Sequence, residues 1–147
     1  MKLSDIRREL LEHHRQIREL MATTRDIALR AREGDGVSRE LQASVICLAD
    51  RVRMHNLREE ELLKDVIPTI DAWGRVRAAI MTAEHIKEHG RLYTALLGIP
   101  ATSAETAGVD VVALIALMLD HMDREEAAFL NEEVLSDDGV IASQSDG

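Results

Sequence analysis

The chain has 147 residues, enough for one domain with a buried core, and only three of them are aromatic, which favours long helices over a β-sheet. Its formal charge of −9 would repel phosphate backbones and anionic membrane surfaces, so we expect neither nucleic acid nor a membrane as a partner. The single cysteine excludes an internal disulfide, and the charged start MKLSDIRREL lacks the apolar core of a signal peptide, which together favour the cytoplasm.

Helical periodicity predicts two helices in the first half of the chain. The first covers about residues 3–32, with apolar residues on one stripe, and it ends before the glycines of EGDG at 33–36. The second begins at Ser38, a residue type that caps helices, and is closed by Pro68. The short link between them favours antiparallel neighbours.

The second half of the chain predicts two more helices and a tail. The third helix covers about residues 75–97 and ends at Gly98, and the fourth covers about residues 107–135. Residues 136–147 are polar and predict a C-terminal tail, which leaves residues 1–135 as the folded domain. The expected fold is all-α, an up-down-up-down four-helix bundle with one core.

Two distant stretches, HNLREEELL from His55 and HMDREEAAF from His121, share one spacing. In each, a glutamate follows four residues after the histidine, so Glu59 and Glu125 lie on the same helix face as their histidines, one turn away. These positions fall on apolar stripes, where a buried carboxylate needs a compensating charge. A bound cation would provide that charge.

The other two helices carry histidines at a matching depth. His85 and His89 repeat the four-residue spacing on the third helix, and His13 and His14 are adjacent on the first. His14 shares its stripe with apolar residues, so we predict that it faces inward and that His13 lies beside the site. At about 1.5 Å per residue, His14 and His55 both lie roughly 26 Å from the turn that joins their helices, so they meet at one level.

Together these residues predict a dinuclear metal centre in the bundle core. A single His–Glu pair is more often an exposed surface pair, but two pairs on apolar stripes with histidines at the same depth favour a metal site. The predicted ligands are His14, His55, Glu59, His85, His89, His121 and Glu125. Imidazole with carboxylate suits iron, manganese or zinc, and paired metals in a bundle core favour two iron ions.

The ligand count predicts an open coordination position. If both carboxylates and one oxo or hydroxo group bridge the ions, the ion with three histidines is six-coordinate and the ion with two is five-coordinate. The vacant position would admit a small ligand such as dioxygen.

Three nearby residues leave alternatives open. Glu126 competes with Glu125 as the ligand of the fourth helix, and the identical spacing in the first motif favours Glu125. Phe129 and Tyr93 follow ligand positions by two turns and one turn, so either can line the site, although both residue types are more often core anchors.

The motifs resemble the hemerythrin-like (HHE cation-binding) family, in particular its bacterial single-domain type. The similar stretches are EHHRQIREL around His14, HNLREEELLKDVIP, EHIKEHGRLYTALL and HMDREEAAFL, and the resemblance covers roughly residues 3–135. It implies a four-helix bundle with a non-haem di-iron centre, in which Glu59 and Glu125 bridge the irons and the five histidines bind terminally.

We expect reversible dioxygen binding, for storage, delivery or sensing, and an oxygen-binding or metal-binding protein rather than an enzyme. Two alternatives remain. One is a di-iron enzyme that acts on peroxide or nitric oxide or oxidises iron, for which the ligand would be that small molecule. The other is a protein whose metals only stabilise the bundle or report the iron level to a protein partner.

Overall fold

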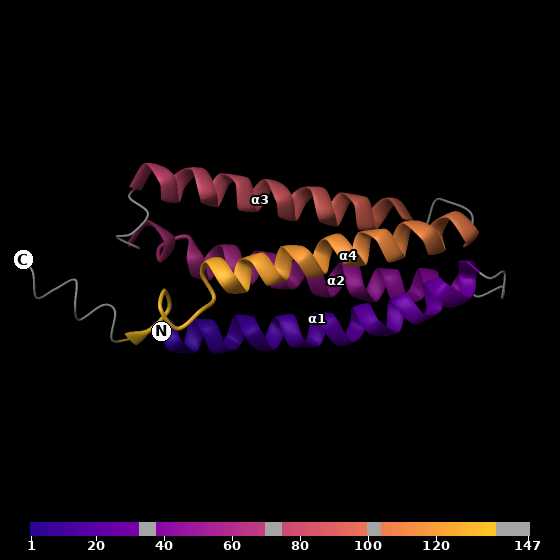
Figure 1. Ribbon diagram of the computed structural model, residues 1–147, viewed down its shortest axis with the longest axis horizontal. Coiled ribbons are helices and arrows are strands. Elements are labelled where there is room, and N and C mark those ends of the chain that lie inside the picture. Colours follow the sequence, from indigo (N-terminus) through magenta and orange to yellow (C-terminus); the bar gives the residue numbers. More distant parts are fainter. Residues whose placement is uncertain (33–37, 70–74, 100–103, 138–147) are drawn as a thin grey trace, which may run out of the picture.

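The computed structural model describes residues 1–32, 38–69, 75–99 and 104–137. Its helices are α1 (Leu3–Arg32), α2 (Ser38–Leu63), the short 3₁₀-helix η1 (Ile67–Thr69), α3 (Arg75–Gly98) and α4 (Ala104–Ala128). Figure 1 shows the four α-helices side by side along one long axis, with successive helices running in opposite directions. The predicted all-α, up-down-up-down four-helix bundle is confirmed, and the described ranges contain no strand.

The first helix illustrates why the sequence forms this bundle. Asp5 lies in the first turn of α1, and Arg30 and Arg32 lie in its last turn, so these charges complement the helix dipole. Its buried residues recur at steps of three and four and form one stripe that faces the other helices. They are Ile6, Leu10, His14, Ile17, Met21, Thr24, Ile27, Ala28 and Ala31.

The predicted boundaries agree with the structure at most helix ends that can be compared. The turn at 33–36 lies outside the described residues. The second helix ends at Leu63, and Pro68 lies beyond it within η1. No described helix carries an apolar stretch of the length that a bilayer span requires.

The fourth helix ends at Ala128, so the prediction that it continues to near Leu135 is wrong. Asn131 explains the difference, because its side chain replaces backbone helix bonds. Its Nδ2 donates to the carbonyl of Ala127 at 2.8 Å, and its Oδ1 accepts from the backbone N–H groups of the second and third residues after it, both at 3.0 Å. The chain then turns back over the bundle and buries Leu135.

The predicted tail at 136–147 begins with a contact to the first helix. The Asp137 carboxylate accepts a hydrogen bond from the Ser4 backbone N–H at 3.2 Å and another from the Ser4 hydroxyl at 2.7 Å. The two ends of the described chain therefore lie together. Residues 138–147 lie outside the described part.

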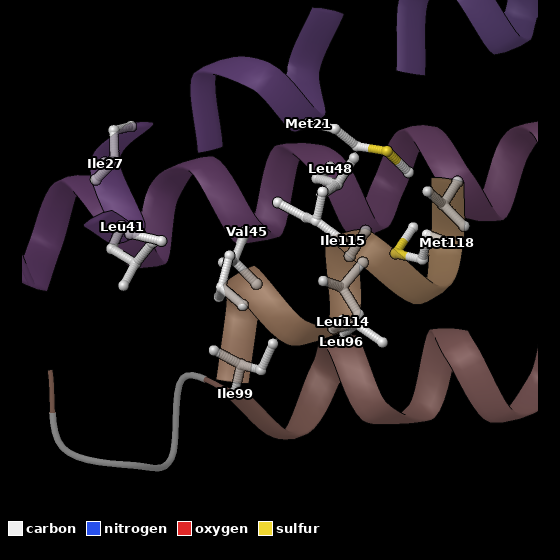
Figure 2. Close-up of a cluster of buried hydrophobic side chains, with 14 of the residues drawn as sticks. Met21, Ile27, Leu41, Val45, Leu48, Leu96, Ile99, Leu114, Ile115 and Met118 are labelled. Atoms are coloured by element: carbon white, nitrogen blue, oxygen red, sulfur yellow. The ribbon is translucent and has the colours of Figure 1, made fainter. Parts of the chain in front are cut away.

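The core contains two hydrophobic clusters. The larger cluster draws on all four helices, and Figure 2 shows Leu48, Leu96 and Ile115 packed together within it. The smaller cluster lies toward the other end of the bundle and consists of Ile6, Leu10, Leu63, Ile67, Phe129, Leu130 and Leu135.

A polar layer separates these two clusters. On α1, Leu10 belongs to the smaller cluster and Ile17 to the larger, and the buried His14 lies between them. Met122 of α4 and Phe129, the residue after its end, belong to different clusters, and the buried Glu125 lies between them. Polar residues on successive helices thus meet at one level of the bundle.

Candidate metal centre

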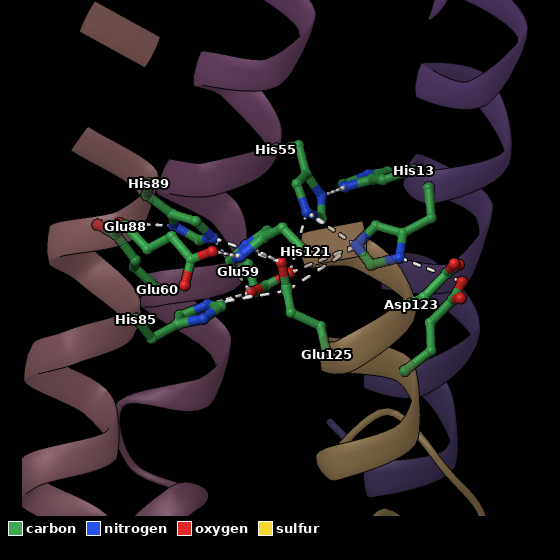
Figure 3. A network of polar contacts seen from close by, with 12 residues as sticks. His13, His55, Glu59, Glu60, His85, Glu88, His89, His121, Asp123 and Glu125 are labelled. Atoms are coloured by element: carbon green, nitrogen blue, oxygen red, sulfur yellow. Dashed lines mark hydrogen bonds and ion pairs between the residues drawn. The ribbon is translucent and has the colours of Figure 1, made fainter. Parts of the chain in front are cut away.

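The polar layer is built from all four helices, and Figure 3 shows its side chains converging on one point. Its carboxylates are buried, with exposed fractions of 0% for Glu59 and 3% for Glu125. The side chain of His85 is the most exposed of the layer, at 11%. All seven predicted ligand residues lie here: His14, His55, Glu59, His85, His89, His121 and Glu125.

These residues form two groups that share one carboxylate. One group contains His85, His89, His121 and Glu125, and the other contains His14, His55, Glu59 and Glu125. Within each group, one nitrogen or oxygen atom per residue lies within 4.8 Å of the corresponding atom of every other member. The structure therefore has one group with three imidazoles and one group with two.

Glu59 extends between the two groups. Its Oε2 lies 2.9 Å from Nε2 of His55 and 3.7 Å from Nε2 of His14. Its Oε1 contacts Nε2 of His85 and lies 3.7 Å from Nε2 of His89. One carboxylate oxygen therefore faces each group, as a bridging ligand requires.

Glu125 is placed in the same way from the opposite helix. Its Oε1 contacts Nε2 of His121 and lies 3.6 Å from Nε2 of His89. Its Oε2 lies 3.9 Å from Nε2 of His14 and 3.8 Å from Nε2 of His85. Two carboxylates thus span the space between the two sets of imidazoles.

In four of the histidines Nδ1 faces away from the centre and contacts a residue outside the two groups, which leaves Nε2 directed inward. Nδ1 of His14 lies 3.2 Å from the Glu126 carboxylate. Nδ1 of His89 lies 3.1 Å from Glu60, and Nδ1 of His121 lies 3.1 Å from Glu88. Nδ1 of His55 lies 3.3 Å from Nδ1 of His13. An imidazole whose Nδ1–H donates to a carboxylate presents a free lone pair on Nε2, the form that binds a metal ion.

Two of these outer carboxylates are held by arginines. Arg18 donates two hydrogen bonds of 2.7 Å to Glu126, one to each carboxylate oxygen, and these bonds hold the pKa of Glu126 below its ordinary value. Arg124 donates to Glu88 at 2.7 Å. Burial opposes the ionisation of Glu88, but Arg124 and His121 hold its pKa below the ordinary value. Both carboxylates therefore stay charged as acceptors for the histidines.

His13 and His55 are neutral at neutral pH. Burial is the largest cause that lowers the pKa of each, and it outweighs the opposite effect of Glu59 on His55. One ring can therefore donate its Nδ1–H to the other. The prediction that His13 lies beside the site is in agreement with this contact.

The donor atoms fit a cation. Four buried atoms of the polar layer have no hydrogen-bond partner within the described part of the chain: Oε2 of Glu59, Oε2 of Glu125, Nε2 of His89 and Nε2 of His121. Each such atom costs about 1–3 kcal/mol when it is left unsatisfied. Coordination to a metal ion would satisfy all four at once.

The ionisation of the two glutamates supports the same conclusion. Burial and the charge of Glu59 raise the pKa of Glu125 well above its ordinary value. Burial opposes the charge of Glu59 too, but its contacts with Glu125 and with the imidazoles of three histidines hold its pKa well below that value. Without a cation the raised pKa of Glu125 favours its protonated form, whereas divalent ions would favour both carboxylates in the ionised form.

Two cavities adjoin the polar layer on different sides. The first, called here the apolar cavity, has a volume of about 20 Å³ and contacts His55, His89, His121 and Glu125. Its other walls are mostly apolar: Ile17, Met21, Val52, Leu92, Met118 and Met122, with Asn56. The second, called here the outer pocket, has a volume of about 160 Å³ and reaches His85, His121 and Glu125 from the surface between α3 and α4.

The remaining residues that the sequence singled out take separate places. Glu126 contacts the outer nitrogen of His14 and lies outside both groups, whereas Glu125 belongs to both. The ring of Phe129 meets that of His85 edge-on, with 5.2 Å between ring centres, and it lines the outer pocket. Tyr93 packs against the larger hydrophobic cluster.

Sequence reasoning missed two outer carboxylates, Glu60 and Glu88. Each is a direct neighbour in sequence of a ligand position, Glu59 and His89 respectively. That adjacency was the available signal, because a residue next to an inward position lies on the flank of its helix and can reach the neighbouring helix.

Comparison with known proteins agrees with this site. The family model of the hemerythrin HHE cation-binding domain matches residues 5–132, which include all members of both groups. The resemblance inferred from the motifs is thereby confirmed. No match was found among curated proteins, and none among solved structures.

Proposed function

We propose that this chain, which belongs to the hemerythrin HHE cation-binding domain family, is a non-haem di-iron protein that binds dioxygen reversibly. The family and the buried His and Glu groups support a metal-binding protein. Two ions are proposed because the seven side chains form two groups with a shared carboxylate, too many ligands for one ion. Iron is proposed because the donors are imidazole and carboxylate and the paired site lies in a bundle core.

The apolar cavity is the observation that supports dioxygen as the ligand. Its volume of about 20 Å³ is near that of one water molecule, which suits a diatomic molecule, and its walls are mostly apolar. It contacts His55, a member of the group with only two imidazoles. The cavity also contacts His89 and His121 of the other group, so a small apolar ligand in it would reach both groups, including the one that has fewer protein ligands.

The side chains of this protein would perform distinct tasks at the site. His14 and His55 would hold one ion, His85, His89 and His121 the other, and Glu59 and Glu125 both. An iron(II) pair held there would supply two electrons to dioxygen on binding and recover them on its release. Ile17, Met21, Val52 and Met118 exclude water from the cavity, which would slow irreversible oxidation.

Reversibility of the absorption spectrum tests this proposal. The iron-loaded protein is reduced without air, exposed to dioxygen and then flushed with an inert gas. We expect two iron ions per chain, and a charge-transfer band that appears with dioxygen and fades when it is removed. A band that never forms, or one that persists after flushing, would contradict reversible binding.

A di-iron enzyme that acts on peroxide or nitric oxide is a second candidate, and the outer pocket favours it. The pocket gives polar molecules a path from solvent to His121 and Glu125, which turnover requires and storage does not. Loss of peroxide and consumption of nitric oxide would be measured for the wild type and for Glu59→Ala. Rates that the substitution leaves unchanged would exclude the centre as their source.

A further inference from the structure

The outer pocket connects solvent with the buried centre. At its outer side lie the exposed Glu84 and Arg124, whose side chain is 58% exposed. The buried residues His121 and Glu125 lie at its inner side. Nε2 of His121 and Oε2 of Glu125 have no hydrogen-bond partner in the described part of the chain. The pocket therefore ends on atoms suited to bind a cation.

The charge of the pocket also favours a cation. Besides Glu125, two carboxylates line it, those of Glu84 and Glu88, against one guanidinium, that of Arg124. A cleft with an excess of one charge attracts ions of the opposite sign and raises their rate of association. The apolar cavity is not a suitable entrance for an ion. A hydrated ion that entered it would lose its water molecules, and walls such as Met21 and Val52 offer no polar groups to replace them.

We propose that the outer pocket is the entrance through which divalent metal ions reach the centre, and that Arg124 is its gate. The inference rests on the proposed metal centre but not on what the loaded centre binds. With three imidazoles behind it, the pocket opens on the group that has more protein ligands, so it serves loading better than it serves binding of an exogenous ligand.

Arg124 is placed to obstruct this entrance. Its Nη2 donates to Glu88 at 2.7 Å and its Nε donates to Asp120 at 2.9 Å. The guanidinium thus occupies the wall of the pocket as a fixed positive charge, and it engages the same Glu88 oxygen that lies 3.1 Å from Nδ1 of His121. Because Arg124 is largely exposed, it can swing into solvent to admit an ion.

The rate of metal uptake by the metal-free full chain tests the gate. Co²⁺ is mixed with the protein in a stopped-flow instrument, and its visible absorption reports binding; a chelator then measures release. Arg124→Gln is expected to accelerate both uptake and release by about ten-fold, since a gate changes both rates together. Uptake is the decisive rate, because looser positioning of His121 through Glu88 would weaken the affinity through release alone and would leave uptake unchanged.

Matched controls separate the gate from a general change of charge. Arg15→Gln removes the same charge from an arginine that also holds two carboxylates on an exposed helix face, those of Glu12 and Glu19. It should leave both rates unchanged. Arg124→Lys keeps the charge but cannot hold Glu88 and Asp120 together, so it should also accelerate uptake.

A second pair of variants tests the attraction of cations. Glu84→Gln is expected to slow uptake about three-fold and to weaken its dependence on ionic strength, because one charge of the entrance is lost. Glu133→Gln removes the same charge from an exposed residue outside the pocket lining and should change neither quantity.

Each outcome decides the proposal. Equal rates in Arg124→Gln and Arg15→Gln would overturn the gate, and so would a change in affinity without faster uptake, which would mean that Arg124 only positions His121 through Glu88. If all variants bind two Co²⁺ at one rate, the entrance is wrong and the metal centre stands. If the wild type binds no Co²⁺, the metal centre itself is wrong.

Discussion

Individual residues around the centre fix the orientation of the imidazoles. Three histidines place Nδ1 against a carboxylate, so the ring plane and the tautomer are set before any ion arrives. Two of these carboxylates are in turn held by arginines, Arg18 and Arg124. Glu60 belongs to the same outer set and contacts His89.

Removal of one outer carboxylate should weaken metal binding without touching the inner ligands. Glu60→Ala is expected to lower the affinity for Co²⁺ about 10–100-fold, because Nδ1 of His89 loses its partner. Competition with a chelator measures this affinity. Glu61→Ala is the control, since Glu61 is exposed and pairs with Arg58 instead; an equal loss in both variants would refute the role of Glu60.

At the scale of helices, α1 and α4 approach each other closely at Gly108. A Cβ atom there would lie 2.7 Å from the carbonyl oxygen of Ala28 and 3.0 Å from Cγ of Arg32. Backbone cannot yield as a flexible side chain does, so the two helices would have to separate. Glycine is therefore required by packing and not by turn geometry.

The pair Gly108→Ala and Gly90→Ala tests this contact. Gly108→Ala should destabilise the metal-free protein by about 1–3 kcal/mol, because overpacking outweighs the better helix propensity of alanine. Gly90 has no neighbouring atom within 4 Å of such a Cβ, so Gly90→Ala should stabilise α3 by up to about 1 kcal/mol. Urea unfolding measures both changes, and equal signs would contradict the close approach.

The third helix depends on the centre for its attachment. Between residues 82 and 91 the only buried side chain is His89, and the apolar contacts of the described part of α3 with the larger cluster lie further on, at the half-buried Leu92 and Tyr93 and the buried Leu96. In α1, by contrast, apolar residues are buried on both sides of His14. Ligand bonds would therefore hold this part of α3 against the bundle.

Metal removal should loosen α3 before the other helices. When the ions are chelated, we expect the amide hydrogen exchange of residues 82–92 to accelerate more than ten-fold. This corresponds to a decrease of at least about 1.4 kcal/mol in the free energy of local opening. Amides of α1 near Ile17 and Met21 should change less, because the larger hydrophobic cluster holds them. A uniform acceleration over all four helices would exclude a selective effect on α3.

At the scale of the whole molecule, two hydrophobic clusters stabilise the bundle and a polar layer between them opposes folding until an ion binds. Since each end has its own apolar core, the bundle should remain helical without metal. The ions would then add stability by binding to the folded state alone.

Chelation should therefore lower the melting temperature without abolishing the helical signal at 25 °C. Ions at about a thousand-fold excess over Kd add about 4 kcal/mol, which for a chain of this size corresponds to about 8–16 °C. Circular dichroism measures both quantities. In Glu59→Ala, which lacks one spanning carboxylate, the difference between the metal-loaded and chelated forms should shrink markedly; an undiminished difference would place the stabilising ions elsewhere.

Most of this architecture could be predicted from the sequence, because a helix repeats every 3.6 residues and His14, His55, Glu59, His121 and Glu125 fall on its apolar stripes. Periodicity says nothing about which flank residues of neighbouring helices meet, so adjacency to a ligand marks Glu60 and Glu88 as candidates but does not predict their contacts with His89 and His121. The end of α4 was missed for a local reason, since Asn131 competes with the backbone through its side chain. The arrangement of Glu59 between the two groups required coordinates.

The bonds between Ser4 and Asp137 have a practical consequence for engineering. Two linkers, one attached at each end of the described chain, would both start from the same corner of the bundle. That corner lies about 15 Å along α1 from the level of His14. The domain would thus tolerate insertion into a surface loop of a host protein, because its two junctions with the host would lie side by side and away from the polar layer.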